Sequence, residues 1–300
     1  MLHQSGHKPK FTTTRLVAVA ATAAAVLATT ALVMTLSSEG DETRPGGGPV
    51  ENPGARQAAV DGLRLELATT QLSPGEPGQL RFQVVGEDGR AVRDFEVEHA
   101  KRLHLIVVRD DLRGFQHLHP RMSADGNWST AVTLREPGSY RVFADFKHRG
   151  QSQTLAGTVT VEGAAEPLPL PAPAGQATTA TGYTVHLSES LGAGSPVLSF
   201  HVARDGRSVE LQDYLAAKGH LVALREGDLA YVHTHPGGGA GGQGGAHAGH
   251  GGGHAGHGTV PGGAVTFEAA FPSAGRYRLF FQFKHEGRVH TAAFTHQVSG

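Results

Sequence analysis

An internal repeat constrains the fold of this chain more than any other feature of its sequence. The segment HLIVVRDDLRGFQHLHP at 104–120 aligns without a gap with HLVALREGDLAYVHTHP at 220–236, and YRVFADFKHRG at 140–150 aligns with YRLFFQFKHEG at 277–287. The order and spacing are kept, apart from a Gly/His-rich insertion at 237–263 in the second copy. Each copy is about 100 residues long, which is too long for a solenoid repeat, so the sequence predicts two domains of one fold.

Each copy has the pattern of short β-strands. Leu63, Leu65 and Leu67 alternate with polar residues, whereas residues 105–108 are apolar at every position. Alternation predicts a strand with one buried face, and a continuous apolar run predicts a central strand covered on both sides. About seven such strands in about 100 residues predict an all-β chain of two tandem immunoglobulin-like β-sandwiches. A short helix remains open only for residues 207–218.

The amino terminus has the pattern of a membrane anchor. Lys8, Lys10 and Arg15 precede residues 16–36, which contain no Asp, Glu, Lys or Arg. An apolar run of about 20 residues spans a bilayer as a helix, and the positive-inside rule places the preceding basic residues in the cytoplasm. We therefore expect a single-pass membrane protein with extracytoplasmic domains. The alternative is a cleaved signal segment, which would lead to secretion of the same domains.

Composition and repeat together divide the chain into six segments. The expected segments are a cytoplasmic amino terminus at 1–15, a transmembrane anchor or signal segment at 16–36, a flexible stalk at 37–59, a first sandwich at 60–162, a Pro/Ala-rich linker at 163–181, and a second sandwich at 182–300 that contains the insertion 237–263.

Composition argues against several classes of function. The 26 Lys and Arg against 27 Asp and Glu give a net charge of -1, which argues against a nucleic-acid-binding surface. Cysteine is absent, which excludes disulfides, thiolate metal sites and a blue-copper site. The sequence has no His-Glu-x-x-His motif, no Gly-x-Ser-x-Gly motif and no phosphate-binding glycine loop, so we do not expect an enzyme.

Histidine, in contrast, occurs 19 times, and four histidines recur in both copies. The motif His117-Leu118-His119-Pro120 places two imidazoles on one face of a strand, about 6.5–7 Å apart and next to a loop. A third imidazole, for which His104 is the candidate, would complete a three-histidine site that suits Cu(II), Zn(II) or Ni(II). The alternative is a structural role, with hydrogen bonds to loop backbone. The candidate ligands in the two copies are His104, His117, His119, His220, His233 and His235.

The other histidines are interpreted differently. His148 and His285, the fourth recurring pair, lie in Lys-His-x-Gly, which predicts exposed residues of a hairpin turn. His290 follows that turn and is the candidate for an additional ligand. The remaining histidines of the two domains are expected to be ordinary strand or surface residues: His99, His186, His201 and His296.

The insertion is a separate metal-binding candidate. Only small residues separate its histidines in GGQGGAHAGHGGGHAGHG, so it cannot form a core of its own. Short histidine-rich tracts are typical of metal binding, and a chelator that must be ordered on binding suits capture or buffering. The alternative is a low-complexity loop without a ligand. The candidate ligands are His247, His250, His254 and His257.

The HLIVV…FQHLHP and FADFKHRG segments resemble those of exported bacterial proteins with paired His-containing β-domains. More loosely, they are similar to the YtkA-like and CopC-like domains associated with extracytoplasmic copper handling. The resemblance covers about 60–162 and 180–298, and it implies a β-sandwich fold and a preference for copper at the four His-x-His residues His117, His119, His233 and His235. CopC-like proteins are expected to use a mature amino-terminal histidine. No cleavage site presents one here, so that site is not carried over.

These observations leave two main functions open. The first is a membrane-tethered extracytoplasmic protein that captures or buffers Cu(II) or Zn(II), with binding that weakens as pH falls through the imidazole pKa near 6.5. The alternative is an extracytoplasmic interaction or scaffold protein with no role for metal, because immunoglobulin-like sandwiches carry many unrelated functions. The expected partners are a metal ion, the membrane through residues 16–36, and a protein that the sequence does not identify.

Overall fold

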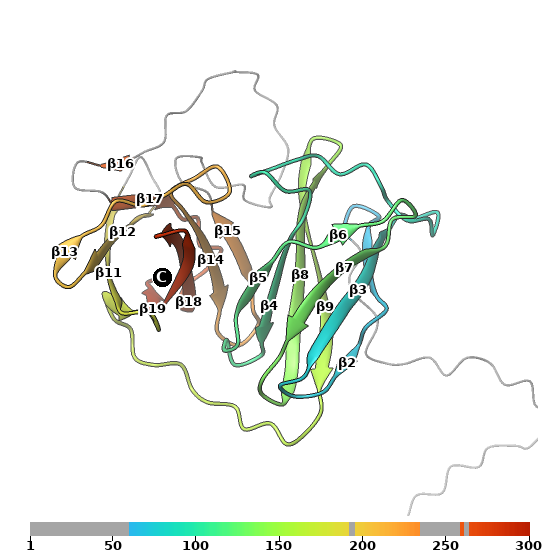
Figure 1. Ribbon diagram of the computed structural model, residues 1–300, viewed down its shortest axis with the longest axis horizontal. Coiled ribbons are helices and arrows are strands. Elements are labelled where there is room, and N and C mark those ends of the chain that lie inside the picture. Colours follow the sequence, from blue (N-terminus) through green and yellow to red (C-terminus); the bar gives the residue numbers. More distant parts are fainter. Residues whose placement is uncertain (1–59, 192–195, 235–258, 261–263) are drawn as a thin grey trace, which may run out of the picture. The chain divides into compact units, whose positions relative to one another are not determined.

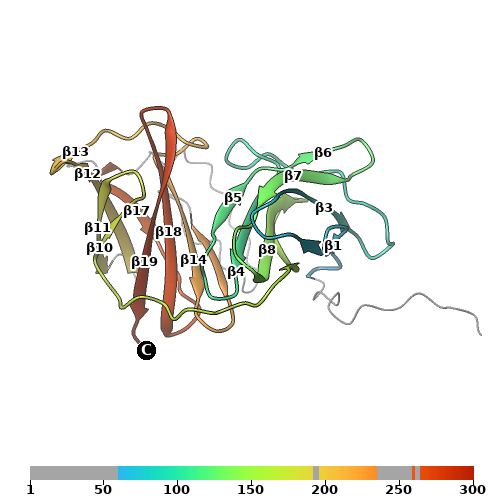
Figure 2. The same cartoon turned by 60° about the horizontal axis from the view of Figure 1, so that its bottom comes forward.

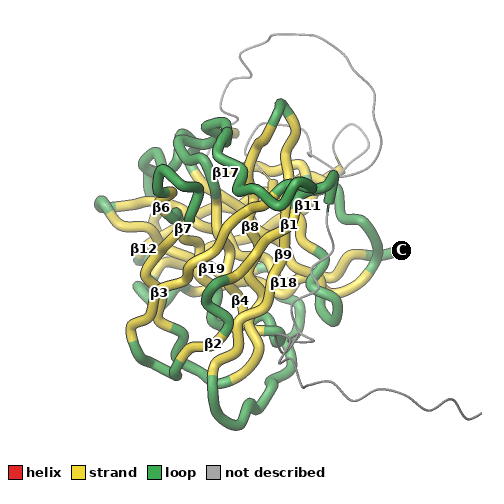
Figure 3. The backbone as a smooth tube through the Cα atoms, turned by 90° about the vertical axis from the view of Figure 1, so that its right-hand side faces the viewer, coloured by secondary structure: helices red, strands yellow, loops and turns green. Residues whose placement is uncertain are grey.

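The computed structural model describes residues 60–191, 196–234, 259–260 and 264–300, all within one compact unit, Glu51–Gly300. These residues form strands and loops without a helix (Figure 3), which confirms the all-β prediction. The short helix left open at 207–218 does not form. The segments predicted at 1–15, 16–36 and 37–59 lie outside the described residues. Within the described ranges there is no helix with the length and apolar character needed to cross a bilayer.

The first repeat is a sandwich of two sheets (Figure 1). One sheet has the strand order β1-β3-β7-β6 and the other β2-β9-β8-β4-β5. This is the immunoglobulin-like arrangement, with strands A-B-E-D in one sheet and G-F-C in the other. The strands are β1 (Arg64–Leu67), β2 (Gln71–Leu72), β3 (Pro77–Val85), β4 (His104–Arg109), β5 (Gln116–Leu118), β6 (Arg121–Met122), β7 (Trp128–Thr133), β8 (Gly138–His148) and β9 (Gln151–Val161).

The main strands of the second repeat have the same order. Its sheets have the orders β10-β11-β12-β17-β16, with β13 paired to β12, and β15-β14-β18-β19. The described part of the insertion forms β16. The strands are β10 (Gln176–Thr178), β11 (Tyr183–Leu191), β12 (Pro196–Arg204), β13 (Arg207–Ser208), β14 (Gly219–Arg225), β15 (Tyr231–Thr234), β16 (Thr259–Val260), β17 (Ala264–Glu268), β18 (Gly275–His285) and β19 (Arg288–Val298).

Each sandwich has its own core and a tyrosine corner. The buried Tyr140 hydroxyl donates to the carbonyl oxygen of Glu136 at 2.9 Å, and the buried Tyr277 hydroxyl donates to that of Ser273 at 2.9 Å. Such a bond at the start of the F strand is a hallmark of immunoglobulin-like domains. Topology and corners together confirm the immunoglobulin-like prediction for both repeats.

A third apolar cluster joins the two sandwiches. Leu105 and Val107 of β4 pack in the core of the first repeat, whereas Ile106 and Val108 pack in the third cluster with Val222 of β14. All four of these β4 residues are fully buried. The prediction of a central strand covered on both sides is therefore confirmed, and the second cover is the other repeat (Figure 2).

Equivalent residues make the contact twice. The ring of Phe115 stacks on that of Phe280 with centroids 4.1 Å apart, and Phe143 stacks on Tyr231 at 5.0 Å. The sequence repeat pairs Phe115 with Tyr231 and Phe143 with Phe280. The same patch is thus used on both sides, as in a twofold-symmetric dimer interface.

The linker is attached to both repeats. Leu170 is buried in the third cluster. The Leu168 amide donates to the Asp111 carboxylate of the first repeat at 3.2 Å, and the Ala174 amide donates to the Thr295 carbonyl of the second at 3.2 Å. These contacts fix the segment across the interface.

Because both repeats contribute to the third cluster, we expect them to unfold together. Tyr277→Phe removes one buried hydrogen bond from the second repeat and should lower the free energy of unfolding by about 1 kcal/mol. Trp128, the only tryptophan, lies in the core of the first repeat and reports unfolding there. Urea denaturation followed by Trp128 fluorescence should show a lower midpoint for Tyr277→Phe, as for the matched variant Tyr140→Phe. An unchanged midpoint for Tyr277→Phe would contradict coupled unfolding.

Candidate metal centre

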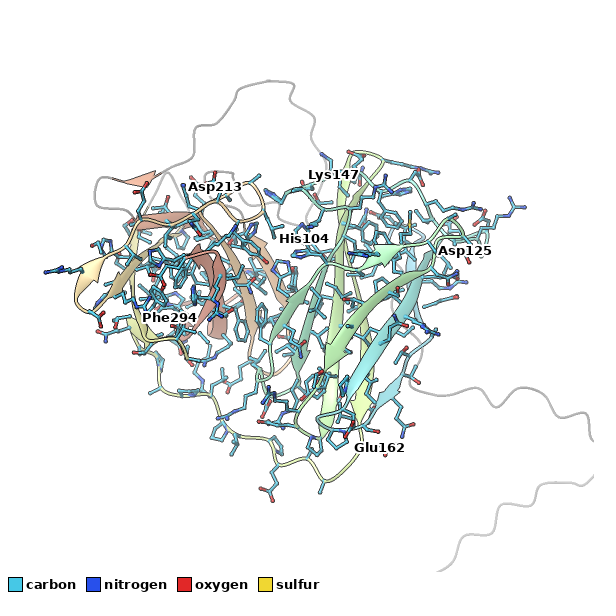
Figure 4. All side chains as sticks on the ribbon, viewed as in Figure 1. His104, Asp125, Lys147, Glu162, Asp213 and Phe294 are labelled. Carbon is cyan, nitrogen blue, oxygen red and sulfur yellow. The ribbon has the colours of Figure 1, made fainter. Side chains whose placement is uncertain are left out.

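Three histidines of the first repeat meet at one end of the interface. His104 begins β4 (Figure 4), His117 lies in β5, and His119 follows that strand. One ring nitrogen of each lies within 4.8 Å of the others. His104 is buried, and the other two are half-buried. The structure thus brings together the three residues that the sequence predicts as one site.

The strand register explains why these side chains share a face. The antiparallel pairing of β4 with β5 places His117 opposite Ile106, so both side chains point to the same face of the sheet. His104 lies two residues from Ile106 and His119 two residues from His117, and side chains two apart along an extended strand share a face. Ile106 belongs to the third cluster. The histidines therefore lie on the face that meets the second repeat.

Two carbonyl oxygens determine which ring nitrogens face each other. Nε2 of His104 lies 3.3 Å from the Glu98 carbonyl oxygen, and Nδ1 of His117 lies 2.7 Å from Oε1 of Gln282. These oxygens only accept hydrogen bonds, so both of these nitrogens carry hydrogen. The facing nitrogens, Nδ1 of His104 and Nε2 of His117, lie 3.0 Å apart, and in these tautomers both present lone pairs.

Facing lone pairs at this distance repel unless a cation binds them. The cation can be a proton or a metal ion. With metal–nitrogen distances of about 2.0–2.1 Å, two neighbouring nitrogen ligands lie about 2.8–3.4 Å apart. The separation of 3.0 Å between His104 and His117 fits this range. A ligating histidine normally donates its other N–H to a carbonyl or carboxylate, as both rings do here.

His119 supplies a third nitrogen in the form that binds metal. Its Nε2 is buried and has no hydrogen-bond partner among the described residues. Burial, with a smaller effect of the Lys101 charge, lowers the pKa of His119 to about 4, so the ring is neutral at pH 7. A buried polar atom without a partner costs about 1–3 kcal/mol, and coordination of an ion would remove that cost.

His220 of the second repeat lies beside the triad. It is the equivalent of His104, and its Nε2 lies 2.9 Å from the Tyr214 carbonyl oxygen, as that of His104 lies near Glu98. Its ring centroid is 6.4 Å from that of His104 and 6.2 Å from that of His117. Two imidazoles on a tetrahedral ion have centroids about 5 Å apart. Ligation by His220 stays a prediction and requires a shift of about 1 Å.

His99 is a neighbour of the site that the sequence did not indicate. Its ring centroid lies 5.7 Å from that of His220 and 6.3 Å from that of His104. His99 and Ala100 both have positive φ, 48° and 61°, in a two-residue turn. The aligned residue in the second repeat is Leu215, so the repeat carried no signal for a histidine here.

The remaining predicted ligands have little or no described structure. The backbone of His233 pairs with Val222 just as that of His117 pairs with Ile106. The side chain of His233 lies outside the described part of the chain. The same holds for the whole of His235, His247, His250, His254 and His257.

His148 and His285 are not exposed turn residues, so that prediction is wrong. His148 is 8% exposed, and its Nδ1 lies 2.9 Å from the Asp94 carbonyl oxygen. His285 is half-buried, with Nδ1 2.8 Å from the Tyr183 hydroxyl. Each is the last residue of its strand and lies two residues after a core phenylalanine, so its side chain points inward.

His290 lies away from the triad. It is 6% exposed, with Nδ1 2.8 Å from the Thr181 hydroxyl and Nε2 3.3 Å from the His285 carbonyl oxygen. Its ring packs against Tyr183 and Phe283. The structure therefore places His290 in the packing of the second repeat rather than with the three clustered histidines.

Fold and site together define a protein of two immunoglobulin-like β-sandwiches with a histidine cluster at their interface. Residues 58–163 and 177–300 each match the family described as "Domain of unknown function (DUF8832)". The chain belongs to this family and carries its domain twice. The search of curated proteins found no match.

The three solved structures that follow show distant likeness. The FdeC adhesin of Escherichia coli is 13% identical, with a TM-score of 0.27, over 82% of this chain and 66% of that chain. Escherichia coli alpha-2-macroglobulin is 14% identical, with a TM-score of 0.26, over 79% of this chain and 20% of that chain. A chimeric titin Z1Z2 tandem is 13% identical, with a TM-score of 0.19, over 78% of this chain and 97% of that chain. Likeness at this level carries no inference about function.

The lowered pKa of His119 predicts a pH-dependent stability of the metal-free protein. Between about pH 4 and the ordinary value of 6.5, the unfolded state binds more protons than the folded state. The free energy of unfolding is therefore highest above pH 6.5 and falls as the pH drops toward 4. This histidine should account for a loss of about 1–2 kcal/mol at pH 5. Urea denaturation at pH 7.5 and 5.0, with a chelator present, measures this loss in free energy of unfolding. It should be smaller in His119→Gln than in the unaltered protein, and equal losses would contradict a lowered pKa of His119.

Proposed function

We propose that this protein binds a divalent metal ion through His104, His117 and His119 and thereby captures or buffers Cu(II) or Zn(II). The observation that carries the proposal is the 3.0 Å separation of Nδ1 of His104 and Nε2 of His117. The other nitrogen of each ring donates to a carbonyl oxygen, so the two facing nitrogens present their lone pairs to each other. The buried Nε2 of His119, for which the described part of the chain provides no hydrogen-bond partner, supports the proposal.

The ligand set favours borderline metals. Three neutral imidazoles suit Cu(II), Zn(II) and Ni(II), whereas Mg(II) and Ca(II) prefer oxygen ligands. The chain has no cysteine, so thiolate cannot enter the site. In an oxidising extracytoplasmic compartment, a site without thiols is not lost to disulfide formation. The resemblance to copper-associated domains adds a preference for copper.

We place this function outside the cytoplasm, in a protein anchored by residues 16–36. The support is the apolar run and the basic residues before it. A secreted form after signal cleavage would carry the same centre. Capture rather than catalysis is proposed, because the sequence contains no His-Glu-x-x-His motif, no Gly-x-Ser-x-Gly motif and no phosphate-binding glycine loop.

The insertion is proposed to deliver ions to the centre. Its histidines lie outside the described residues, but the strand that precedes it is described. β15 ends at Thr234, which pairs with Leu221, the neighbour of His220. The last described residue before the insertion therefore lies at the histidine end of the interface. A tethered chelating tract raises the local concentration of its ion near that end.

The alternative function is an extracytoplasmic interaction or scaffold protein. The immunoglobulin-like topology of both repeats fits this class, and a fold of this kind does not itself require a metal. In that case the clustered histidines share a proton and act as part of the packing between repeats. The two functions differ in their response to metal, which decides between them.

Calorimetric titration of the full chain, purified in mild detergent, tests the proposal with Zn(II) and Cu(II). We expect binding that survives deletion of 237–263 and weakens more than about 100-fold in His117→Gln/His119→Gln, because loss of a second-shell partner alone costs about 10–100-fold. The matched control is His148→Gln/His296→Gln, whose side chains have partners away from the centre.

Binding that disappears with 237–263 and is unaffected by His117→Gln/His119→Gln would limit metal binding to the insertion. If neither the full chain nor any variant binds Zn(II) or Cu(II), the metal proposal is overturned and the interaction function remains.

A further inference from the structure

We propose that the metal centre of the first repeat is assembled by both repeats, with Gln282 of the second repeat as the positioning residue for His117. This inference rests on the proposed function. It adds that the docking of the two sandwiches and the binding of the ion strengthen each other.

The side-chain amide of Gln282 is held at both ends. It lies in β18 and is 7% exposed. Its Nε2 donates to the Thr291 hydroxyl at 3.2 Å, which directs Oε1 toward Nδ1 of His117 at 2.7 Å. The register pairs Gln282 with His220, so it lies on the interface face of its sheet. This acceptor is therefore rigidly placed.

Gln282 determines which ring nitrogen of His117 can bind an ion. An acceptor at Nδ1 holds the hydrogen on that nitrogen and leaves the lone pair on Nε2, which faces His104. Without Gln282 the ring of His117 could adopt the other tautomer or rotate away. The acceptor at Nδ1 comes from across the interface, so the second repeat takes part in positioning a ligand of the first.

The hydrogen bond between His117 and Gln282 is one of two neighbouring contacts between the repeats. Phe115 lies two residues before His117, and Phe280 lies two residues before Gln282, so each pair shares a face of its strand. Phe115 stacks on Phe280 while His117 bonds to Gln282. An ion bound to His117 therefore stabilises the docked arrangement, and docking raises the affinity for the ion by the same factor.

The first repeat suggests which substitution preserves the interaction. The alignment places Asp145 at the position of Gln282, so a carboxylate occurs at the equivalent place in the other repeat. A carboxylate also accepts from Nδ1 and makes the imidazole a more basic ligand. Gln282→Glu is therefore the conservative variant, and Gln282→Met keeps the length of the side chain but removes the acceptor.

Zn(II) titration of the full chain in mild detergent tests the inference. Gln282→Met should weaken Zn(II) binding about 10–100-fold, the usual effect of losing a second-shell partner, and Gln282→Glu should restore it. Gln153→Met is the matched control, because Gln153 is a buried glutamine that donates to Asp61, away from the centre. It should bind Zn(II) as the unaltered protein does. A role in packing alone would not distinguish Glu from Met in this way.

Failure of this inference is distinguishable from failure of the proposed function. Zn(II) binding that requires His117 and His119 but is unchanged in Gln282→Met would overturn the inference and leave the metal centre intact. Zn(II) binding that is unchanged both in His117→Gln/His119→Gln and in Gln282→Met would overturn the inference and the proposed function together. If Gln282→Met does not fold, Phe280→Leu tests the same coupling, since it breaks the ring stack and leaves every polar group in place. It should also weaken Zn(II) binding, and unchanged affinity would overturn the inference.

Discussion

The apolar contact between the outer faces of β4 and β14 is the constraint on which the rest of the structure depends. In a single immunoglobulin-like sandwich, one face of each sheet is covered by the other sheet and the opposite face meets water. Here Ile106 and Val108 on the outer face of β4 are fully buried against the second repeat. Polar residues at the end of that face are therefore also removed from water. The histidine cluster is buried because it shares a face with these aliphatic residues.

Much of this arrangement could be predicted from the sequence, because it depends on local periodicity. The repeat gives two domains, and the spacing of two along a strand places His117 and His119 on one face. The apolar run at 105–108 correctly predicts a strand covered on both sides. What covers it could not be predicted, because the contacts join residues far apart in the chain. Gln282 is 165 positions from His117, and a single sequence has no periodicity over such a separation. His99 escaped prediction because its aligned residue is a leucine.

The interpretation of His148 shows a different limit. Lys-His-x-Gly does contain a turn, but Arg149 and Gly150 make it, with φ of 50° and 78°. A two-residue turn leaves His148 as the last residue of β8, on the same inward face as Phe146. A shift of one residue in the assumed turn moves a side chain from solvent to the core. Turn motifs locate a hairpin well, but they do not determine the face of the flanking residue without the register.

The internal symmetry of the interface is broken at the histidine centre. The stacks of Phe115 on Phe280 and of Phe143 on Tyr231 preserve the symmetry of the duplication. At the centre, Gln282 stands where the first repeat has Asp145, and His99 stands where the second has Leu215. A neutral amide and a carboxylate tune a bonded imidazole differently, because the carboxylate makes it more basic. The backbone of His104 pairs with Asp145 and that of His220 with Gln282, so these two equivalent histidines meet unequal surroundings. A duplicated sandwich needs symmetry to dock its two halves, whereas a metal centre at the interface needs only one half to present ligands and the other to orient them.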